Sequence, residues 1–320
     1  MKSIGVVTSG GDAPGMNAAI RAVVRIAHSK GFQTYGFERG WEGLMNNVVR
    51  PLTPRSVGGI LQLGGTILHT SRSSEFREQE GIKKAAGTLA SNNVDGLVVI
   101  GGNGSFDGAL RLSKKTDTLI VGVPASIDND VFGTDETIGF DTAVNTAVVE
   151  IDKIRDTAIS LERVFIVEVM GRTRGFLALT VGLTIGAEVI LVPEVKTNCA
   201  DIVNTIKENS AKGKRSGIIV AAEGIGDTHK LAKQVERETG KEVRLSILGY
   251  AQRGGSPSAR SRLLASLFAN EAVELLSKEK GNRIVCLQKG QITNLDLGKS
   301  CETEKPLDLN LFKLARALAT

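Results

Sequence analysis

The sequence predicts an α/β protein built on a mostly parallel, doubly wound sheet. Short apolar runs of strand length alternate with longer helix-like stretches along the whole chain, and this βαβα order is typical of parallel sheets. Three unusual loops, two rich in glycine and one in carboxylates, each follow an apolar run. At 320 residues the chain has material for about two domains, so one such sheet or two fit the pattern.

The expected elements follow one another in a regular order. The expected strands are almost uninterrupted apolar runs, as strands buried on both faces should be. They lie at residues 4–8, 96–100, 118–123, 164–169, 217–222 and 283–287. The expected helices lie at residues 16–28, 106–112, 142–155, 201–211, 230–239 and 260–276. The apolar stretch 177–192 contains Glu188 and ends at Pro193, so it predicts a buried helix and a strand, and no membrane span.

The composition is that of a globular protein with a slight basic excess. Hydrophobic residues make up 41% and charged residues 23%, which excludes disordered and fibrous chains. The 40 Lys and Arg against 35 Asp and Glu leave a formal charge of +5, which suits an anionic ligand or simply reflects a solvated surface. The basic clusters 212–215 and 278–283 are short and lack aromatic neighbours, which argues against a nucleic-acid partner.

The cysteines and the first residues indicate a cytoplasmic location. Cys199, Cys286 and Cys301 are far apart and lack metal-binding spacing, so we expect reduced thiols. Met1 leads directly into a strand-like run, with no sign of a secretory signal.

Two glycine loops are candidates for phosphate binding. GGDAPG at residues 10–15 and GGNGS at residues 101–105 each open a predicted helix, where free backbone N–H groups and the positive helix end attract anions. The alternative is that each loop is only a tight turn. Neither loop matches the GxxxxGK[ST] or GxGxxG patterns, which excludes a Walker-type P-loop and weakens a Rossmann dehydrogenase.

The loop at residues 124–130 has the strongest catalytic character. Ser126, Asp128 and Asp130 alternate, so in an extended segment their side chains share a face, and one carboxylate can act as a general base. The alternative is an Asx-turn that caps nearby backbone. His28, His69 and His229 are scattered without triad or metal spacing, which leaves carboxylates as bases and arginines as charge stabilisers.

Seven ordered motifs resemble the bacterial 6-phosphofructokinases over essentially the whole chain. They are GGDAPGMNAAIR (10–21), GGTILHTSR (64–72), GGNGS (101–105), SIDND (126–130), VEVMGR (167–172), AEG (222–224) and LGYAQRGGSP (248–257). The resemblance implies two Rossmann-like α/β domains, with residues 1–139 and 252–302 binding nucleotide and residues 140–251 and 303–320 binding sugar phosphate. It also implies that ATP phosphorylates the 1-hydroxyl of fructose 6-phosphate in glycolysis.

The resemblance also implies roles for individual residues. Asp128 would accept the hydroxyl proton, assisted by Ser126, Arg172, Gly11 and Arg72. The nucleotide would contact Gly11, Arg72, Ser73, Gly102, Asn103, Gly104 and Ser105. The sugar phosphate would contact Ser126, Ile127, Asp128, Arg163, Met170, Gly171, Arg172, Glu223, Arg244, Tyr250 and Arg253. Mg²⁺ would be held near Asn103, with Asp130 as a second candidate ligand.

By the same resemblance, the protein would be a homotetramer with an effector site for ADP or phosphoenolpyruvate. The matching residues are Arg21, Arg25, Arg155, Gly186, Ala187, Glu188, Lys212, Lys214, Arg215 and Ser216. Arg163 and Arg244 would reach across to the substrate of a neighbouring subunit.

Some residues depart from the family pattern. Asn103 stands where the family has a metal-binding aspartate, so we expect weaker Mg²⁺ binding, and one alternative is a regulatory paralogue that binds nucleotide without catalysis. Tyr250 stands where histidine is frequent, and Trp41 replaces a smaller aromatic residue. Pyrophosphate-dependent relatives tend to carry aspartate and lysine at the positions of Gly104 and Ala125, so these residues favour ATP over pyrophosphate as the donor.

Overall fold

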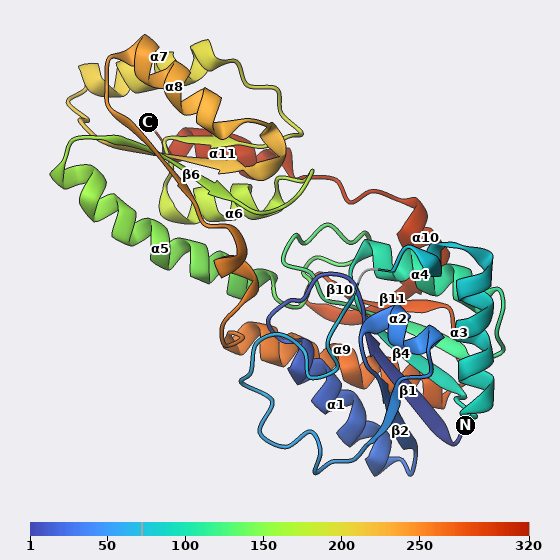
Figure 1. Ribbon diagram of the computed structural model, residues 1–320. Helices are drawn as coiled ribbons and strands as arrows, with labels where there is room; N and C mark the ends of the chain where they lie inside the picture. The colour runs from blue at the N-terminus through green and yellow to red at the C-terminus, as the bar shows by residue number, and fades with distance from the viewer. Residues whose placement is uncertain (72, 320) are drawn as a thin grey trace. The chain divides into compact units, whose positions relative to one another are not determined.

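The computed structural model describes residues 1–71 and 73–319, which divide into two compact units. The first unit comprises Met1–Thr142 and Arg253–Lys305, and the second comprises Ala143–Gln252 and Pro306–Thr320. Each unit contains its own sheet, so of the two arrangements compatible with the sequence, the chain has two sheets (Figure 1). The nucleotide-binding and sugar-binding roles expected for the two parts stay predictions.

The first unit is built on a seven-stranded sheet in which every neighbouring pair is parallel except the two edge pairs β10–β11 and β2–β3. In spatial order its strands are β11 (Gln291–Asp296), β10 (Arg283–Gln288), β5 (Leu119–Pro124), β4 (Gly96–Gly101), β1 (Ser3–Thr8), β2 (Gln33–Phe37) and β3 (Val49–Leu52).

Helices cover both faces of this sheet (Figure 1). On one face α1 (Met16–Ser29) packs against α9 (Ala259–Ser277). The other face carries α2 (Gly40–Met45), η1 (Glu75–Arg77), α3 (Gln79–Ser91), α4 (Asn103–Ser113) and α10 (Leu297–Glu302). This two-sided cover explains why the central strands are apolar along their whole length.

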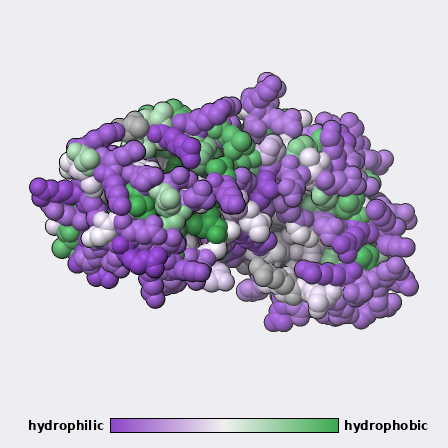
Figure 2. Space-filling model, turned by 90° about the horizontal axis from the view of Figure 1, so that it is seen from above, coloured by the Kyte–Doolittle hydropathy of each residue, from purple (hydrophilic) through white to green (hydrophobic). Residues whose placement is uncertain are grey.

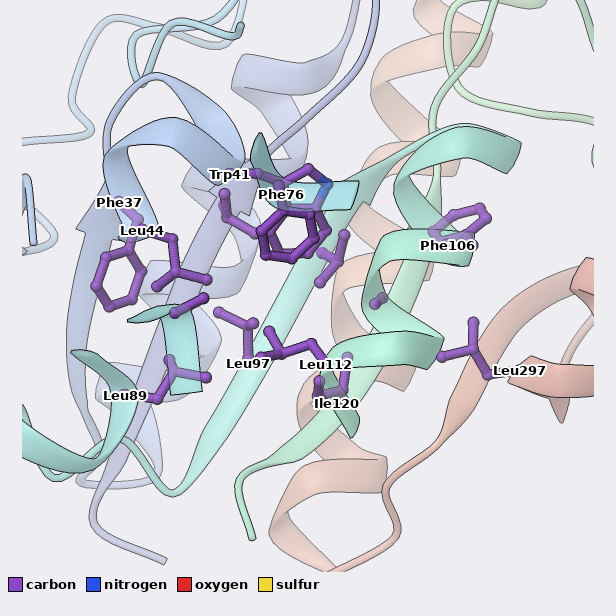
Figure 3. Packing of buried hydrophobic residues seen from close by; sticks show 14 of the residues in the cluster. Phe37, Trp41, Leu44, Phe76, Leu89, Leu97, Phe106, Leu112, Ile120 and Leu297 are labelled. Carbon is purple, nitrogen blue, oxygen red and sulfur yellow. The ribbon is translucent and has the colours of Figure 1, made fainter. Parts of the chain in front are cut away.

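The core on the α3–α4 side contains a stacked aromatic pair. Trp41 and Phe76 lie with ring centroids 4.4 Å apart and planes within 3° of parallel (Figure 3). They pack beside Gly108, where a Cβ would lie 2.9 Å from the Phe76 ring. Leu44, Leu97 and other buried residues complete the cluster. Trp41 is therefore a core residue of the first unit.

The second unit is built on a four-stranded parallel sheet. In spatial order its strands are β7 (Val189–Leu191), β8 (Gly217–Ala222), β6 (Val164–Val169) and β9 (Val243–Ile247). Its helices and short 3-10 turns are α5 (Phe140–Ser160), α6 (Phe176–Ile185), α7 (Cys199–Ala211), η2 (Glu223–Ile225), α8 (Thr228–Thr239), η3 (Gly249–Arg253) and α11 (Leu309–Leu318), of which α5 and η3 run across the unit boundaries. The helix and strand expected within residues 177–192 are α6 and β7.

Two general features agree with the sequence. The three cysteines are free thiols, and burial raises the pKa of the Cys286 thiol to about 12. None of the helices in the described part of the chain has the length and apolar character needed to cross a bilayer.

Figure 2 shows a face dominated by hydrophilic side chains, with hydrophobic residues exposed in smaller areas between them.

Candidate active site

Three loops lie side by side at one edge of the seven-stranded sheet, because β1, β4 and β5 are adjacent and parallel. A buried hydrogen bond joins the loop after β1 to the loop after β4, with Ser105 Oγ donating to Ser9 O over 2.9 Å. The loops after β4 and β5 are also in contact, since a Cβ on Gly102 would lie 3.6 Å from Ser126 Cβ. The fold thus brings together the three motifs that the sequence singled out.

The loop after β1 has a conformation that only glycine adopts without strain at two positions. Gly10 has φ of +87° and Gly15 has φ of +110°. Gly11 approaches Arg253 closely, because a Cβ at this position would lie 2.3 Å from Arg253 Nη1. The same nitrogen donates to Asp12 O over 3.1 Å. Arg253, expected at the sugar phosphate, therefore braces the glycine loop expected at the nucleotide.

The loop after β4 leads directly into the N-terminus of α4, where backbone N–H groups can bind an anion. Gly102 precedes the helix, and the N–H groups of Asn103 and Gly104 have no acceptor within it because they lie in its first turn. A Cβ on Gly104 would have no described atom within 4 Å, so this residue borders open space. Ser105, which is 2% exposed, fixes this turn through its hydrogen bond to Ser9 O.

The loop after β5 holds Asp128 in a buried position. Asp128 is 3% exposed, its N–H donates to Ser126 Oγ over 3.2 Å, and Ile127 beside it is also buried. Asn129 has φ of +52°. Its Oδ1 accepts from Thr137 N over 3.1 Å. The local turn contact in this segment is thus made by Ser126, whereas Asn129 binds the backbone of Thr137, eight residues further on, and so fixes the chain next to Asp128.

The edge of the expected nucleotide site is described only in part. Arg72, expected to contact the nucleotide and to assist catalysis, lies outside the described residues. Ser73 Oγ accepts a hydrogen bond from Phe76 N over 3.1 Å and so caps the η1 turn.

The residues expected to hold Mg²⁺ fit an ion bound mainly by substrate phosphates. Asn103 Nδ2 donates to Asp130 O over 3.1 Å, so the amide nitrogen is engaged, and the amide oxygen and the Asp130 carboxylate are the atoms that could coordinate an ion. In the described residues, no cluster of three or more His, Cys, Asp or Glu could hold a metal. Mg²⁺ is commonly held by one or two carboxylates together with phosphates and water, and this donor set suits that mode.

In the second unit, Glu223 organises the turn after β6. Its Oε1 accepts from Gly171 N over 3.2 Å and from Arg172 N over 2.6 Å. Gly171 has φ of +139° and Arg172 has φ of +53°, so the carboxylate stabilises a backbone that is otherwise unfavourable. Met170 N donates to Gln252 Oε1 over 2.9 Å. Met170, Gly171, Arg172 and Glu223 therefore form one cluster at the carboxyl ends of β6 and β8.

Arg163 and Arg244 lie at the other end of the same sheet. Arg163 Nε contacts Glu242 Oε2 over 2.5 Å, and Arg244 pairs with the same carboxylate. Arg163 precedes β6 whereas Met170 follows it, and a six-residue strand spans about 20 Å. The second unit thus does not bring these arginines to the Glu223 cluster. Glu242, the carboxylate that both arginines contact, was not among the residues expected from the sequence. Tyr250, expected at the sugar phosphate, is 82% exposed.

The expected effector residues fall in both units. Arg21 and Arg25 lie on α1 in the first unit. In the second unit, Arg155 donates to Ile185 O over 2.6 Å, next to Gly186, and Lys214 contacts Glu188 over 3.7 Å. A cavity of about 490 Å³ is lined by Ala187, Glu188 and Lys212 together with residues of α7 and α11. Arg215 instead pairs with Glu162 on the exposed surface, and Ser216 precedes β8.

Comparisons with known proteins show the family of this chain. A family model described as phosphofructokinase matches residues 3–276. The ATP-dependent 6-phosphofructokinases of Clostridium tetani and Lysinibacillus sphaericus are 49% and 50% identical over 319 residues, covering 100% of this chain and of each relative.

Solved structures show the same fold. The chain superimposes on phosphofructokinase from Saccharomyces cerevisiae with a TM-score of 0.88 and 34% identity, over 99% of this chain and 47% of the yeast chain, so it spans about half the yeast chain. The fold is also shared by a pyrophosphate-dependent phosphofructokinase from Marinobacter aquaeolei, with a TM-score of 0.84. The two sequences are 21% identical, and the match covers 97% of this chain and 86% of the Marinobacter chain. Together with the converging loops, these matches show that the chain belongs to the phosphofructokinase family.

Proposed function

We propose that this chain is an ATP-dependent 6-phosphofructokinase, a phosphotransferase of glycolysis. It transfers the γ-phosphoryl group of ATP to the 1-hydroxyl of fructose 6-phosphate and yields ADP and fructose 1,6-bisphosphate. Family membership and the names of the full-length relatives support this reaction. The observation that carries it is the meeting of two glycine loops with the buried Asp128 at one sheet edge.

Asp128 is the general base in this proposal. Its carboxylate takes the proton from the sugar hydroxyl as that oxygen attacks the phosphorus, a role that commonly contributes about 10²- to 10⁴-fold in rate. The hydrogen bonds of Ser126 and Asn129 support this role, since they fix the backbone on either side of the carboxylate. Ile127 completes the segment that faces the sugar.

The nucleotide phosphates lie along the two glycine loops. Asn103 and Gly104 supply backbone N–H groups at the start of α4, where the helix end favours negative charge, and Gly11, Gly102 and Ser105 complete the two loops. Arg72 and Ser73 bind the same phosphates, and Arg172 stabilises the charge that develops on the transferred group. Mg²⁺, held beside Asn103 and Asp130 when bound, neutralises part of the phosphate charge.

The second unit supplies most of the residues for the sugar phosphate. Met170, Gly171, Arg172 and Glu223 line the sugar, and their shared hydrogen-bond cluster supports this role. Arg163, Arg244, Tyr250 and Arg253 bind the 6-phosphate. Since the strand length separates Arg163 from the Glu223 cluster, we propose that Arg163 and Arg244 serve the site of a neighbouring subunit.

Regulation and assembly follow the same proposal. The enzyme is a homotetramer whose effector site takes ADP or phosphoenolpyruvate at Arg21, Arg25, Arg155, Gly186, Ala187, Glu188, Lys212, Lys214, Arg215 and Ser216. The cavity beside Glu188 and Lys212 supports a ligand there. A cytoplasmic location, and the absence of nucleic-acid and membrane partners, stay predictions of the sequence.

A donor-resolved assay tests the proposed reaction. Purified protein is incubated with fructose 6-phosphate and either ATP or pyrophosphate at several Mg²⁺ concentrations, and fructose 1,6-bisphosphate is measured. We expect turnover with ATP, because Gly104 borders open space and leaves room for a nucleotide. Turnover with pyrophosphate alone would reverse the choice of donor. Nucleotide binding without turnover at any Mg²⁺ concentration would identify a non-catalytic paralogue.

A further inference from the structure

Lys305 reaches from the C-terminal segment into the loop after β5. It follows α10 and is the last residue of the first unit before the chain passes to α11. Its Nζ donates to Asn129 O over 2.8 Å and to Asp135 O over 3.1 Å. One ammonium group therefore binds two backbone carbonyls, one of which belongs to the residue directly after Asp128.

These two carbonyls lie at the two ends of the segment 129–135, which follows Asp128 directly. Asn129 Nδ2 donates to Asp135 O over 3.1 Å, so Asn129 and Lys305 share this acceptor. Thr137 N donates to Asn129 Oδ1 over 3.1 Å and holds the other side of the loop. Asn129 adopts the left-handed conformation, with φ of +52°, which asparagine tolerates better than most residues, and the surrounding contacts hold it there. Lys305 supplies one of those contacts from 176 residues along the chain.

The surroundings of Lys305 are acidic. Asp135, Asp130 and Glu136 all interact favourably with its positive charge, and Glu136 also pairs with Arg260 over 2.8 Å. Lys305 is itself partly buried. The segment thus carries carboxylates near a lysine that donates two hydrogen bonds to the backbone.

We propose that Lys305 is a positioning residue for the phosphoryl-transfer reaction: by holding Asn129 O and Asp135 O it keeps Asp128 at the angle needed for proton removal. This inference rests on the proposed function, which makes Asp128 the base. Lys305 acts through the backbone, so its loss lowers kcat and leaves substrate KM values nearly unchanged. A displacement of about 1 Å at a reacting group can cost roughly 10²-fold in rate.

The test compares Lys305→Met with wild type and with Lys299→Met. Lys299 lies on α10 six residues earlier and is exposed, so its variant removes the same charge from the same segment without touching the loop. For each protein, kcat, both KM values and the unfolding temperature are measured with ATP and fructose 6-phosphate. We expect Lys305→Met to lose about 10- to 100-fold in kcat with KM changes below about threefold, and Lys299→Met to match wild type.

Two further variants separate positioning from folding. Lys305→Arg can donate to both carbonyls, and we expect it to recover most of the lost kcat. In Lys305→Ala, added propylammonium replaces the missing side-chain atoms and should raise kcat in a saturable way. If Lys305→Met does not fold, the comparison of Lys305→Arg with Lys305→Ala, with and without propylammonium, carries the same test.

The outcomes distinguish this inference from the proposed function. An inactive wild type would overturn the proposed function itself. An active wild type together with a folded Lys305→Met variant of unchanged kcat would overturn the positioning role alone. The role would also be wrong if Lys299→Met lost as much, or if the loss in Lys305→Met appeared only in KM.

Discussion

Asn103 Nδ2 donates a hydrogen bond to the carbonyl oxygen of Asp130 over 3.1 Å and so joins the first turn of α4 to the loop after β5. An aspartate at position 103 could not make this contact, because an ionised carboxylate has no hydrogen to donate. The side chain that lacks the charge for Mg²⁺ thus joins a loop expected to bind phosphate to the loop that carries Asp128.

Asn103→Asp should therefore have two opposite effects. The added charge should lower the Mg²⁺ concentration required for half-maximal activity, while the lost hydrogen bond should reduce the free energy of unfolding by about 1 kcal/mol. Mg²⁺ titrations of activity and urea unfolding measure the two effects. Asn103→Ala is the control, because it loses the tie without adding the charge and should raise the Mg²⁺ requirement. An identical Mg²⁺ dependence in wild type and Asn103→Asp would contradict the metal assignment.

Asp128→Asn should abolish most of the activity. The substitution keeps the size of the side chain and removes its ability to accept the hydroxyl proton, so we expect kcat to fall by about 10²- to 10⁴-fold. The KM for ATP should change little, because the residues expected to bind ATP lie on the two glycine loops and are not altered by this substitution. Steady-state kinetics with both substrates check this result, and undiminished kcat would exclude Asp128 as the base.

Gly11→Ala should impair activity through Arg253. The new Cβ would lie 2.3 Å from Arg253 Nη1 and would displace the guanidinium from Asp12 O. Loss of a charged hydrogen bond costs about 1.5–3 kcal/mol of the free energy of unfolding. We expect kcat/KM to fall as well, because Arg253 no longer holds the loop expected at the nucleotide. Gly87→Ala is the matched control, since no described atom lies within 4 Å of its Cβ and it sits in a helix. That variant should keep full activity and gain about 0.5–1 kcal/mol of stability.

Lys305 should make stability depend on pH in the alkaline range. Burial is the main cause that lowers the pKa of Lys305 from 10.5 to about 8, against the attraction of Asp135, Asp130 and Glu136. Between pH 8 and 10.5 the unfolded chain binds more protons at this residue than the folded chain does. The free energy of unfolding of wild type should therefore rise with pH, relative to that of Lys305→Met, by at most about 1.4 kcal/mol per pH unit.

Denaturant unfolding of both proteins at pH 7, 8, 9 and 9.5 measures this difference. The other titrating groups, such as Cys301, are common to both proteins and cancel in the comparison. A difference that stays constant over this range would show that the ammonium group has the same pKa in the folded and unfolded chains.

The elements that carry the glycine and carboxylate loops were predictable because buried parallel strands need continuous apolar runs. Strands β1, β4 and β5 were predictable for this reason. The edge strand β11 was not predicted, because it has no fully buried residue and includes Gln291 and Asn294, so it lacks such a run. Helix α3 was not predicted either, because Gly81 and Gly87 weaken its pattern.

The types of residue at the strand ends were likewise determined by the sequence alone, since positive φ and close approach demand glycine at positions such as Gly10 and Gly11. Only the tertiary structure decided which side chains hold those loops. Arg253 binds Asp12 across 241 residues, and Lys305 binds Asn129 across 176. No local periodicity encodes such pairs, because long side chains find their partners only after distant segments have packed side by side.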